Sequence, residues 1–303
     1  MSDKTTDSLD ISVFDRINES GNALERFTLA SQLAGLLNDP EAPAEERDAV
    51  APAVIRLAAD PIVRVRKALA SAITGTPDLH ADIVFTIAAD HDEIALDFLL
   101  KTPSLDAWRM MAIIKVGEPP KQAVIASRGD LDETVIEYIV DNGSPDVVAA
   151  LIDNPCVALG AAQYKHLYVR LTDEPVVVDR LLECDDLPLE IRLMHAKRTS
   201  KRVYHLMAQR GWMAANDAEE LVLDAEESTI VRILEEASLE ELARLIPFMC
   251  DQQLLTPSII LRAACAGDLE LVERAFSYLA SVPVKRVRSM AGGRGLRTIM
   301  AKA

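Results

Sequence analysis

The sequence predicts an all-α fold, an α-solenoid of short helical hairpins followed by a C-terminal helical region. Three observations lead to this prediction. Hydrophobic residues make up 50% of the 303 residues but aromatic residues only 4%, so Leu, Ile, Val and Ala must form the core, as suits closely packed helices. Similar segments recur along the chain, as they do in stacked repeats. No segment shows sustained alternation of apolar and polar residues, so no sheet is expected.

The recurring segments fall into two clear pairs. LAADPIVR at 57–64 returns as IAADHDEI at 87–94, 30 residues later, and IIKVGEP at 113–119 returns as IVDNGSP at 139–145, 26 residues later. Each unit closes with an apolar run and a polar turn, so one period corresponds to two short helices and two turns. A hairpin this short cannot bury its apolar faces alone and is stable only between stacked neighbours.

Three dipeptides mark predicted helix starts: Asp60-Pro61, Ser144-Pro145 and Thr256-Pro257. The side-chain oxygen of the first residue can accept from the unpaired N–H groups of the first turn, so we expect an N-cap at each. Proline loses nothing at the first helical position because its missing N–H would be unpaired there. The residues expected on the buried face of the helix after Asp60 are Ile62, Val65, Leu69, Ala72 and Ile73.

Three regions are expected along the chain. Residues 1–10 are predicted to be a disordered tail, 11–190 the helical repeat region, and 191–303 a helical region that continues or caps the solenoid. Residues 39–48 are interpreted as a connecting loop. The core residues expected in the opening pair of helices, 11–37, are Phe14, Ile17, Leu24, Phe27, Leu33 and Leu36.

Two family resemblances support this fold. The start Asp60-Pro-x-Val-Arg64 resembles HEAT-type repeats, in which the Asp and the Arg commonly support the hairpin. More specifically, the chain resembles the alphaproteobacterial domain-of-unknown-function 2336 family. The stretches that carry this likeness are 57–70, 101–105, 116–118 with 122–128, and 255–269, and it continues through 280–288 and 295–298. The resemblance implies a HEAT-like helical fold and no established activity.

Composition limits the classes of partner and the compartment. The net charge of −16 repels phosphate backbones, so nucleic acid is not an expected partner. The four cysteines are widely spaced without a CxxC pair, which predicts a reduced protein with buried thiols. No apolar stretch has the length of a signal peptide or a membrane span, so we expect a cytoplasmic protein.

The sequence contains no motif of a catalytic or metal centre. HExxH, GxSxG, the Walker glycine loop, GxGxxG and zinc-ligand spacings are all missing, so we predict a non-enzymatic protein without cofactor or metal. His91 lies among acids in Asp90-His-Asp-Glu93, which we interpret as an exposed helix start. The glycine-rich run at 292–295 could cradle a phosphate, although a flexible turn explains it better.

Two basic windows interrupt the acidic chain. The segment 191–215 contains no acid, and no acid follows Glu273. The candidate residues for binding an anion or a partner are Lys197, Arg198, Lys201 and Arg202 in the window 192–210, and Lys285, Arg286, Arg288, Arg294 and Arg297 in the window 285–302. Lys197 and Lys201 share one side of a helix, as do Arg198 and Arg202. The windows could equally be solvated faces that pair with the acidic body.

These features favour a protein-binding scaffold or adaptor, in a bacterial regulatory role, that uses an extended solenoid surface. The alternative is a sensor that binds a phosphate-bearing ligand or nucleotide through the basic windows. A third possibility, an enzyme that acts on damaged DNA, is disfavoured by the net charge. Membrane contact is expected only as peripheral contact by the amphipathic segment 284–302.

Overall fold

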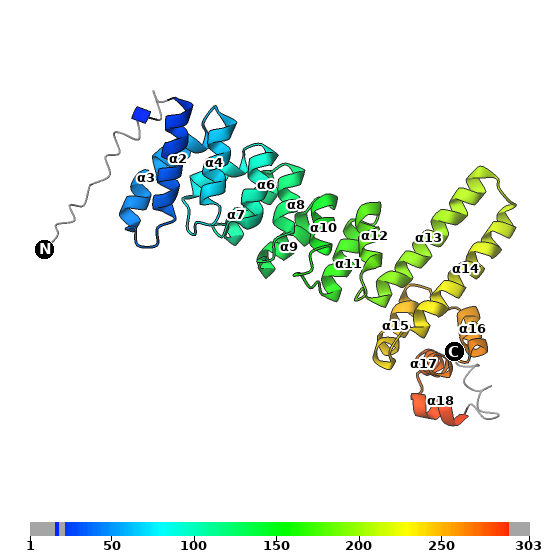
Figure 1. Ribbon diagram of the computed structural model, residues 1–303. Helices are drawn as coiled ribbons and strands as arrows, with labels where there is room; N and C mark the ends of the chain where they lie inside the picture. The colour runs from blue at the N-terminus through cyan, green and yellow to red at the C-terminus, as the bar shows by residue number, and fades with distance from the viewer. Residues whose placement is uncertain (1–15, 18–21, 291–303) are drawn as a thin grey trace. The chain divides into compact units, whose positions relative to one another are not determined.

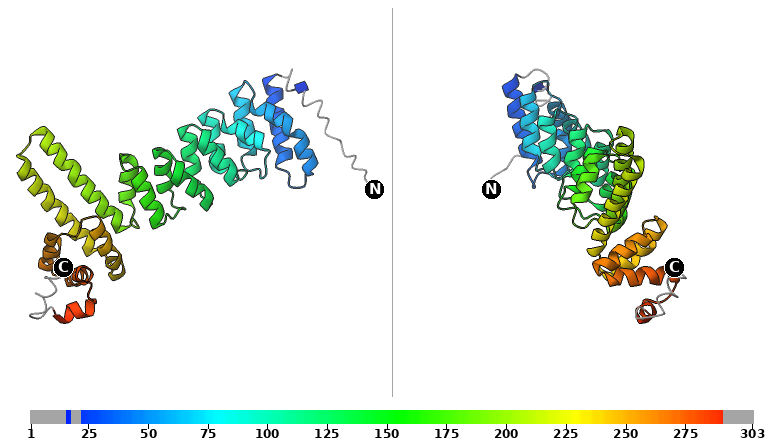
Figure 2. Two further views of the ribbon diagram at one scale, coloured as in Figure 1. Left: turned by 180° about the vertical axis from the view of Figure 1, so that it is seen from behind. Right: turned by 90° about the vertical axis from the view of Figure 1, so that its right-hand side faces the viewer.

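The computed structural model describes residues 16–17 and 22–290, which fold into helices without a strand, so the predicted all-α class is confirmed. The chain divides into two compact units, Met1–Leu181 and Leu182–Ala303 (Figures 1 and 2). The predicted division after residue 190 falls inside the second unit. The predicted tail over 1–10 lies outside the described residues.

Unit 1 is a solenoid-like stack of short helices in two rows. Its helices are α2 (Ala23–Leu37), α3 (Ala44–Ala58), α4 (Val63–Ile73), α5 (Ala81–Ala88), α6 (Asp92–Lys101), α7 (Ala107–Val116), α8 (Pro119–Ala126), α9 (Glu133–Asn142), α10 (Pro145–Ile152), α11 (Ala161–Arg170) and most of α12 (Pro175–Glu183). In one row α2, α4, α6, α8 and α10 pack on each other in that order. In the other row α3 packs on α5, and α9 packs on both α7 and α11.

The predicted repeats coincide with equivalent parts of this stack. The segments 57–64 and 87–94 each contain a helix end, a turn and the start of the next helix. The segments 113–119 and 139–145 each place a glycine two residues before a helix that begins with proline. A Cβ added at Gly117 or Gly143 would lie 2.5 or 2.6 Å from the carbonyl oxygen four residues earlier, so each tight turn requires glycine.

Neighbouring hairpins are joined through the backbone carbonyls of their turns. The Arg66 guanidinium donates to the carbonyl oxygen of Asp60 at 2.7 Å and to the Asp90 carboxylate at 2.6 and 2.9 Å. The Lys121 ammonium donates to the carbonyl oxygen of Asp90 at 2.7 Å, and its side chain is buried. In the same way the Arg26 guanidinium contacts the Asp60 carboxylate at 2.7 Å. Each contact ties one repeat to the next.

The same arrangement continues toward the end of unit 1. Arg128, only 4% exposed, donates to the carbonyl oxygens of Leu99 and Thr102. The buried Asn154 amide donates to the carbonyl oxygens of Ala126 and Arg128 at 2.9 and 2.7 Å. Carbonyls near a helix C-terminus lack partners within the helix, so these side chains satisfy acceptors that burial would otherwise leave unpaired.

Several local expectations need correction. Asp60 is not the N-cap of α4, because that helix starts at Val63 and the Asp60 carboxylate accepts from the backbone N–H of Ile62 in the preceding turn. Ser144 lies at the N-cap of α10, but its hydroxyl makes no capping hydrogen bond. The expectation at Thr256 is confirmed, since its hydroxyl accepts from the backbone N–H of Ile259 at 3.2 Å.

The predicted core was wrong at some positions. Leu24 and Phe27 are 74% and 44% exposed because α2 packs through Leu29, Leu33 and neighbouring alanines. Ala72 is exposed, and α4 buries Ala70 instead. The predicted loop over 39–48 is shorter, since α3 begins at Ala44.

The predicted burial of the four thiols was also wrong. Cys156 and Cys265 are exposed, and Cys184 and Cys250 are only partly buried. Neighbouring aliphatic residues in the sequence did not indicate burial, because adjacent residues on a helix point in different directions.

Unit 2 combines a long hairpin with a compact helical base. Its helices are α13 (Leu189–Arg210), α14 (Ala215–Glu235), α15 (Leu239–Asp251), α16 (Pro257–Ala266), α17 (Leu269–Ala280) and α18 (Val284–Met290). α15 and α16 pack on one half of the hairpin, and α17 packs on α15 and α16. The shared core includes Leu193, Ile230, Leu234 and Leu245. None of the described helices is long and apolar enough to cross a membrane.

We predict that Arg128→Met strongly destabilises unit 1. The substitution leaves two buried carbonyls without a donor, which should lower the free energy of unfolding by about 2–4 kcal/mol. Urea unfolding followed by circular dichroism measures the loss, and amide hydrogen exchange of α6 and α8 localises it. Arg64→Met, at an exposed position of the same unit, is the control. Equal stability of the two variants would contradict this account of Arg128.

Candidate functional site

The first basic window forms much of α13, and its cations face different surroundings. The Lys197 ammonium donates to the carbonyl oxygen of Gln252, in the turn after α15. Lys201 and Arg202 are exposed, whereas Arg198 is partly buried. Lys197 and Lys201 also act on the carboxylate of Glu226 on α14. The window is therefore divided among several contacts within unit 2.

Glu226 lies between the two helices of the hairpin and is partly buried. Burial raises the pKa of its carboxyl above the ordinary 4.5, and the nearby Glu227 acts in the same direction. A hydrogen bond from Ser200 and the charges of Lys197 and Lys201 lower this pKa, but by less than the other effects raise it. The neighbouring lysines thus only partly offset the cost of burying this charge.

The terminal window is only partly described. Lys285, Arg286 and Arg288 lie on α18, whereas Arg294 and Arg297 lie outside the described residues. The same holds for most of the predicted amphipathic segment 284–302 and for the glycine-rich run at 292–295. Arg288 forms ion pairs with Glu270 and Glu273 of α17, both at 2.6 Å. These contacts fasten α18 to the base of unit 2.

The described members of the two basic windows do not come together. α13 packs on α14 and α15, whereas α18 packs on α17. Figures 1 and 2 show α18 well separated from the projecting end of the α13–α14 hairpin. The described cations therefore do not line one common groove.

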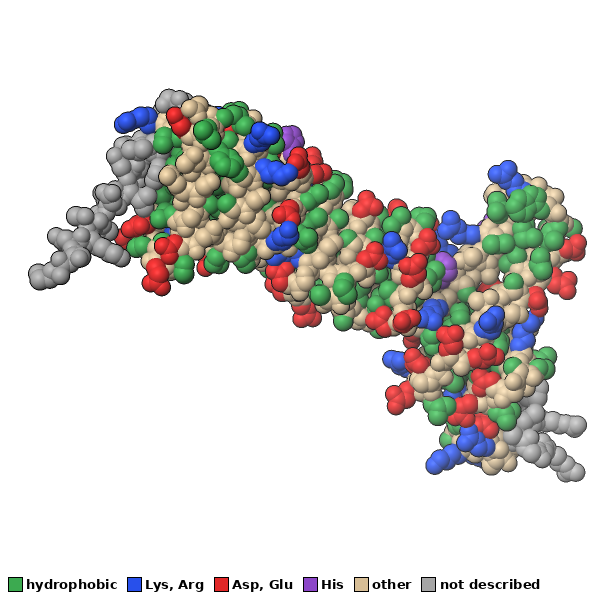
Figure 3. All heavy atoms as spheres, viewed as in Figure 1, with side chains coloured by type: hydrophobic (Ala, Val, Ile, Leu, Met, Phe, Trp, Pro, Cys, Tyr) green, Lys and Arg blue, Asp and Glu red, His purple; other side chains and the backbone are tan. Residues whose placement is uncertain are grey.

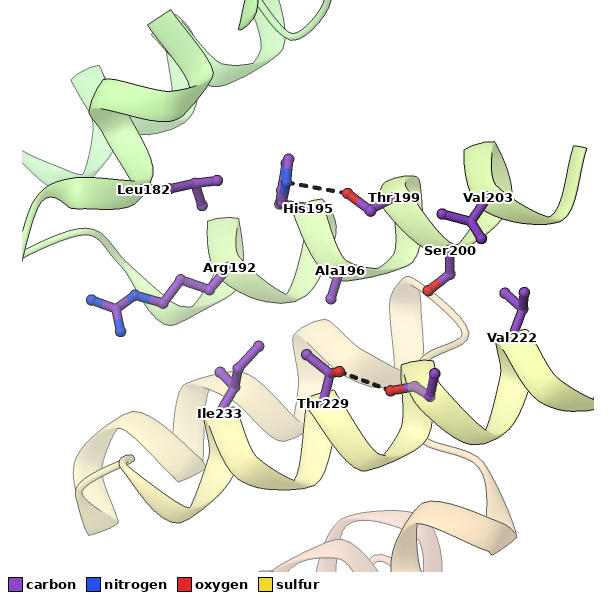
Figure 4. A pocket seen from close by; sticks show the side chains of 11 residues that line it. Leu182, Arg192, His195, Ala196, Thr199, Ser200, Val203, Val222, Thr229 and Ile233 are labelled. Atoms are coloured by element: carbon purple, nitrogen blue, oxygen red, sulfur yellow. Dashed lines mark hydrogen bonds between the residues drawn. The ribbon is translucent and has the colours of Figure 1, made fainter. Parts of the chain in front are cut away.

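The hairpin carries a groove that the sequence did not predict (Figure 4). It has a volume of about 450 Å³ and lies between α13 and α14. Its lining residues on the hairpin are Arg192, His195, Ala196, Thr199, Ser200 and Val203 from α13, and Val222, Ala225, Thr229 and Ile233 from α14. Small side chains predominate, so the two helices leave a shallow hollow between them. The Thr199 hydroxyl and the His195 ring nitrogen are hydrogen-bonded at 3.1 Å.

The projecting half of the hairpin, residues 199–223, has almost no core. The last buried side chain of α13 is Leu193, and beyond it none of the residues 194–210 is buried. Large apolar side chains are instead exposed there: Val203 at 41%, Leu206 at 44%, Trp212 at 66%, Leu221 at 52% and Leu223 at 50%. Figure 3 shows hydrophobic side chains gathered over this part of the hairpin. Such a gathering of exposed apolar side chains is typical of an interaction surface.

A second apolar surface lies on unit 1, on the row of helices that includes α3, α5 and α7. Trp108 is 63% exposed, and its ring meets that of Phe85 edge to face, with centroids 5.7 Å apart. Phe85 also borders a cavity of about 720 Å³. The other lining residues are Ile55, Ala58, Ala59, Thr86 and Ala89, together with Arg66, Asp82 and Asp90.

The described residues contain no cluster of three or more His, Cys, Asp or Glu side chains that could hold a metal ion. His91 is exposed at the N-cap of α6. The neighbouring Asp90 carboxylate points to Arg66, and Glu93 pairs with Lys67. Two of the three acids around His91, Asp90 and Glu93, are thus engaged in ion pairs with α4.

We predict that the charge on Glu226 makes unit 2 sensitive to pH. The pKa of Glu226 is higher in the folded state than in the unfolded state, so the folded state favours the protonated carboxyl. The resulting contribution to stability is fully present below the ordinary pKa of 4.5. It is lost as the pH rises through the folded-state pKa. Glu226→Gln should therefore raise the melting temperature at neutral pH, and the gain should vanish as pH falls toward 4.5. Glu219→Gln, exposed on the same helix, is the control. A gain that is independent of pH would refute the assignment.

Comparison with known proteins leads to one family. No curated protein and no solved structure matches the chain. A family model described as an uncharacterised protein conserved in bacteria, DUF2336, matches residues 94–303. The match spans well over half of the chain, from α6 of unit 1 through the whole of unit 2. The chain therefore belongs to the DUF2336 family of bacterial proteins.

Proposed function

We propose that this protein is a non-enzymatic adaptor that binds a partner protein through the α3–α5–α7 surface of unit 1. The observation that carries the proposal is the exposed Trp108, held edge to face against Phe85, which also borders a cavity. Tryptophan is enriched among the residues that dominate binding energy at protein interfaces. A ring already fixed by a neighbour loses little conformational freedom on binding.

The architecture of unit 1 supports the same function. We interpret its stacked hairpins as HEAT-like repeats, whose rows of helices offer extended surfaces to peptides and helices. The turns after α3 and α5 are joined to other helices by side chains such as Arg66 and the buried Lys121, so we expect this surface to keep its shape. The partner that fits is a segment with both apolar and polar side chains, because Ile55, Phe85 and alanines line the cavity together with charged residues. We further propose that this binding takes place in the cytoplasm.

The sensor alternative has less support. Lys197 is engaged with a backbone carbonyl, Arg288 with two glutamates, and Lys201 lies near Glu226. A phosphate group would have to displace these contacts, and the described cations of the two windows are far apart.

The test begins with a photoreactive amino acid at position 108, with position 116 on the same helix as the control, since Val116 is 82% exposed. Crosslinking in cells should capture one recurring protein from position 108 and not from 116. With that protein purified, Trp108→Ala should weaken binding by about 2 kcal/mol, roughly 30-fold in Kd, whereas Val116→Ala should leave it unchanged.

Two outcomes would overturn the proposal. One is the absence of any crosslinked protein specific to position 108. The other is unchanged affinity of the captured protein for the Trp108→Ala variant, provided that circular dichroism shows the variant folded.

A further inference from the structure

The α13–α14 hairpin presents an apolar face that the described part of the chain leaves largely uncovered, with Leu182 of α12 also lining the groove. Val203 and Thr199 line the groove, and Leu206 follows them at helical spacing on the same side of α13. On α14, Leu221 lies four residues before Ala225, which also lines the groove. We call the surface made by Thr199, Val203, Leu206, Leu221, Ala225 and Thr229 the groove face. α16 packs on α14 through Arg262, which contacts Asp224 and Glu227 on another side of that helix.

An uncovered two-helix hairpin is poorly stabilised. Helices gain most of their stability from packing an apolar face, and residues 194–210 contain no buried side chain. The base of unit 2 packs only on the other half of the hairpin, around Leu193, Ile230 and Leu234. Covering the groove face would provide the projecting half with the core that it lacks.

The two helices carry opposite charge. α13 contains six Lys or Arg residues and one Glu, a net charge of +5, whereas α14 contains seven acids and one Arg, a net charge of −6. Within the projecting half the separation is complete: every charged residue of 199–210 is basic and every charged residue of 215–223 is acidic. Within the described part of the chain, Arg202, Arg210, Asp217 and Glu220 form no ion pair.

We propose that the occupant of the groove face is the same face of a second copy of this chain. Two hairpins would pack face to face, with α13 of each copy lying across α14 of the other, in a symmetric four-helix bundle. This pairing brings the basic helix of one copy to the acidic helix of the other and sets apolar side chains against apolar side chains. Like-on-like pairing of the helices would bring equal charges together.

The charge pattern favours a second copy over other partners. A purely acidic partner, such as a phosphorylated peptide, would meet the acidic residues of α14 as soon as it crossed the groove. The hairpin face has a basic edge, an apolar centre and an acidic edge. A complementary face must carry the same three stripes in reverse order. A second copy of the hairpin, turned about a twofold axis, presents such a face. The small side chains of the groove allow the two hairpins to approach closely.

The test measures the mass of the full chain in solution by sedimentation equilibrium. We expect a reversible dimer, which Leu206→Asp combined with Leu221→Asp weakens about 100-fold or more. Leu223→Asp is the matched control, because Leu223 is as exposed as Leu221 on the same helix but two residues away, on the opposite side. A full chain that stays monomeric at all concentrations overturns the proposal, as does a dimer insensitive to Leu206→Asp with Leu221→Asp.

A charge-reversal experiment tests the pairing of α13 with α14. One variant carries Arg202→Glu and Arg210→Glu, and the other carries Asp217→Lys and Glu220→Lys. Each alone should dissociate, because the segments 199–210 and 215–223 of every copy then carry net charge of the same sign. An equimolar mixture should form a heterodimer. Provided that circular dichroism shows both variants folded, failure of the mixture to associate counts against the pairing. Trp108→Ala, in unit 1, should leave association unchanged, so this proposal and the proposed function can fail separately.

Discussion

The structure of unit 1 depends on hydrogen bonds from buried side chains to the carbonyls where short helices end. Its helices are mostly eight to eleven residues long, and helices of this length are marginal when isolated in water. Frequent turns also bring many unpaired carbonyls into the stack. Arg66, Lys121, Arg128 and Asn154 each donate to such a carbonyl in the neighbouring hairpin. The same bonds therefore satisfy the backbone and fix the register of the stack.

The helices of unit 2 are stabilised differently. With helices of 22 and 21 residues, the α13–α14 hairpin has few ends, and one of them is closed by Gly211 in the left-handed conformation. Long helices need few cross-links at their ends, but they need an apolar partner along their length. The base of unit 2 supplies that partner for only half of the hairpin. The two units thus differ in what limits their stability, buried carbonyls in one and uncovered apolar surface in the other.

Periodicity and turn chemistry made the fold predictable, whereas contacts between distant residues were not predictable. The glycines at 117 and 143 and the cap at Thr256 follow from local geometry, so the sequence indicated them. Arg64 was predicted to be the arginine that supports the hairpin, and Arg66 was missed. The correct choice depends on which arginine of α4 faces Asp90, and this is a contact between distant residues. Exposed Leu24 and Phe27 were assigned to the core, since the sequence does not reveal which face of α2 packs against its neighbours. Residues 294, 297 and 302 lie outside the described residues.

The basic window shows why charge along a sequence is an incomplete guide to a site. Read alone, the cations of α13 suggest an anionic ligand, but the helix that follows carries an even larger charge of opposite sign. Folding sets these two charged segments side by side, with an apolar groove between them. We infer that a partner recognises the order of the three stripes on this surface, basic, apolar and acidic. No single stripe defines the surface. This order of stripes is complementary to itself after a twofold rotation. It exists only in the folded chain, because the turn at Gly211 places the acidic helix α14 alongside the basic helix α13.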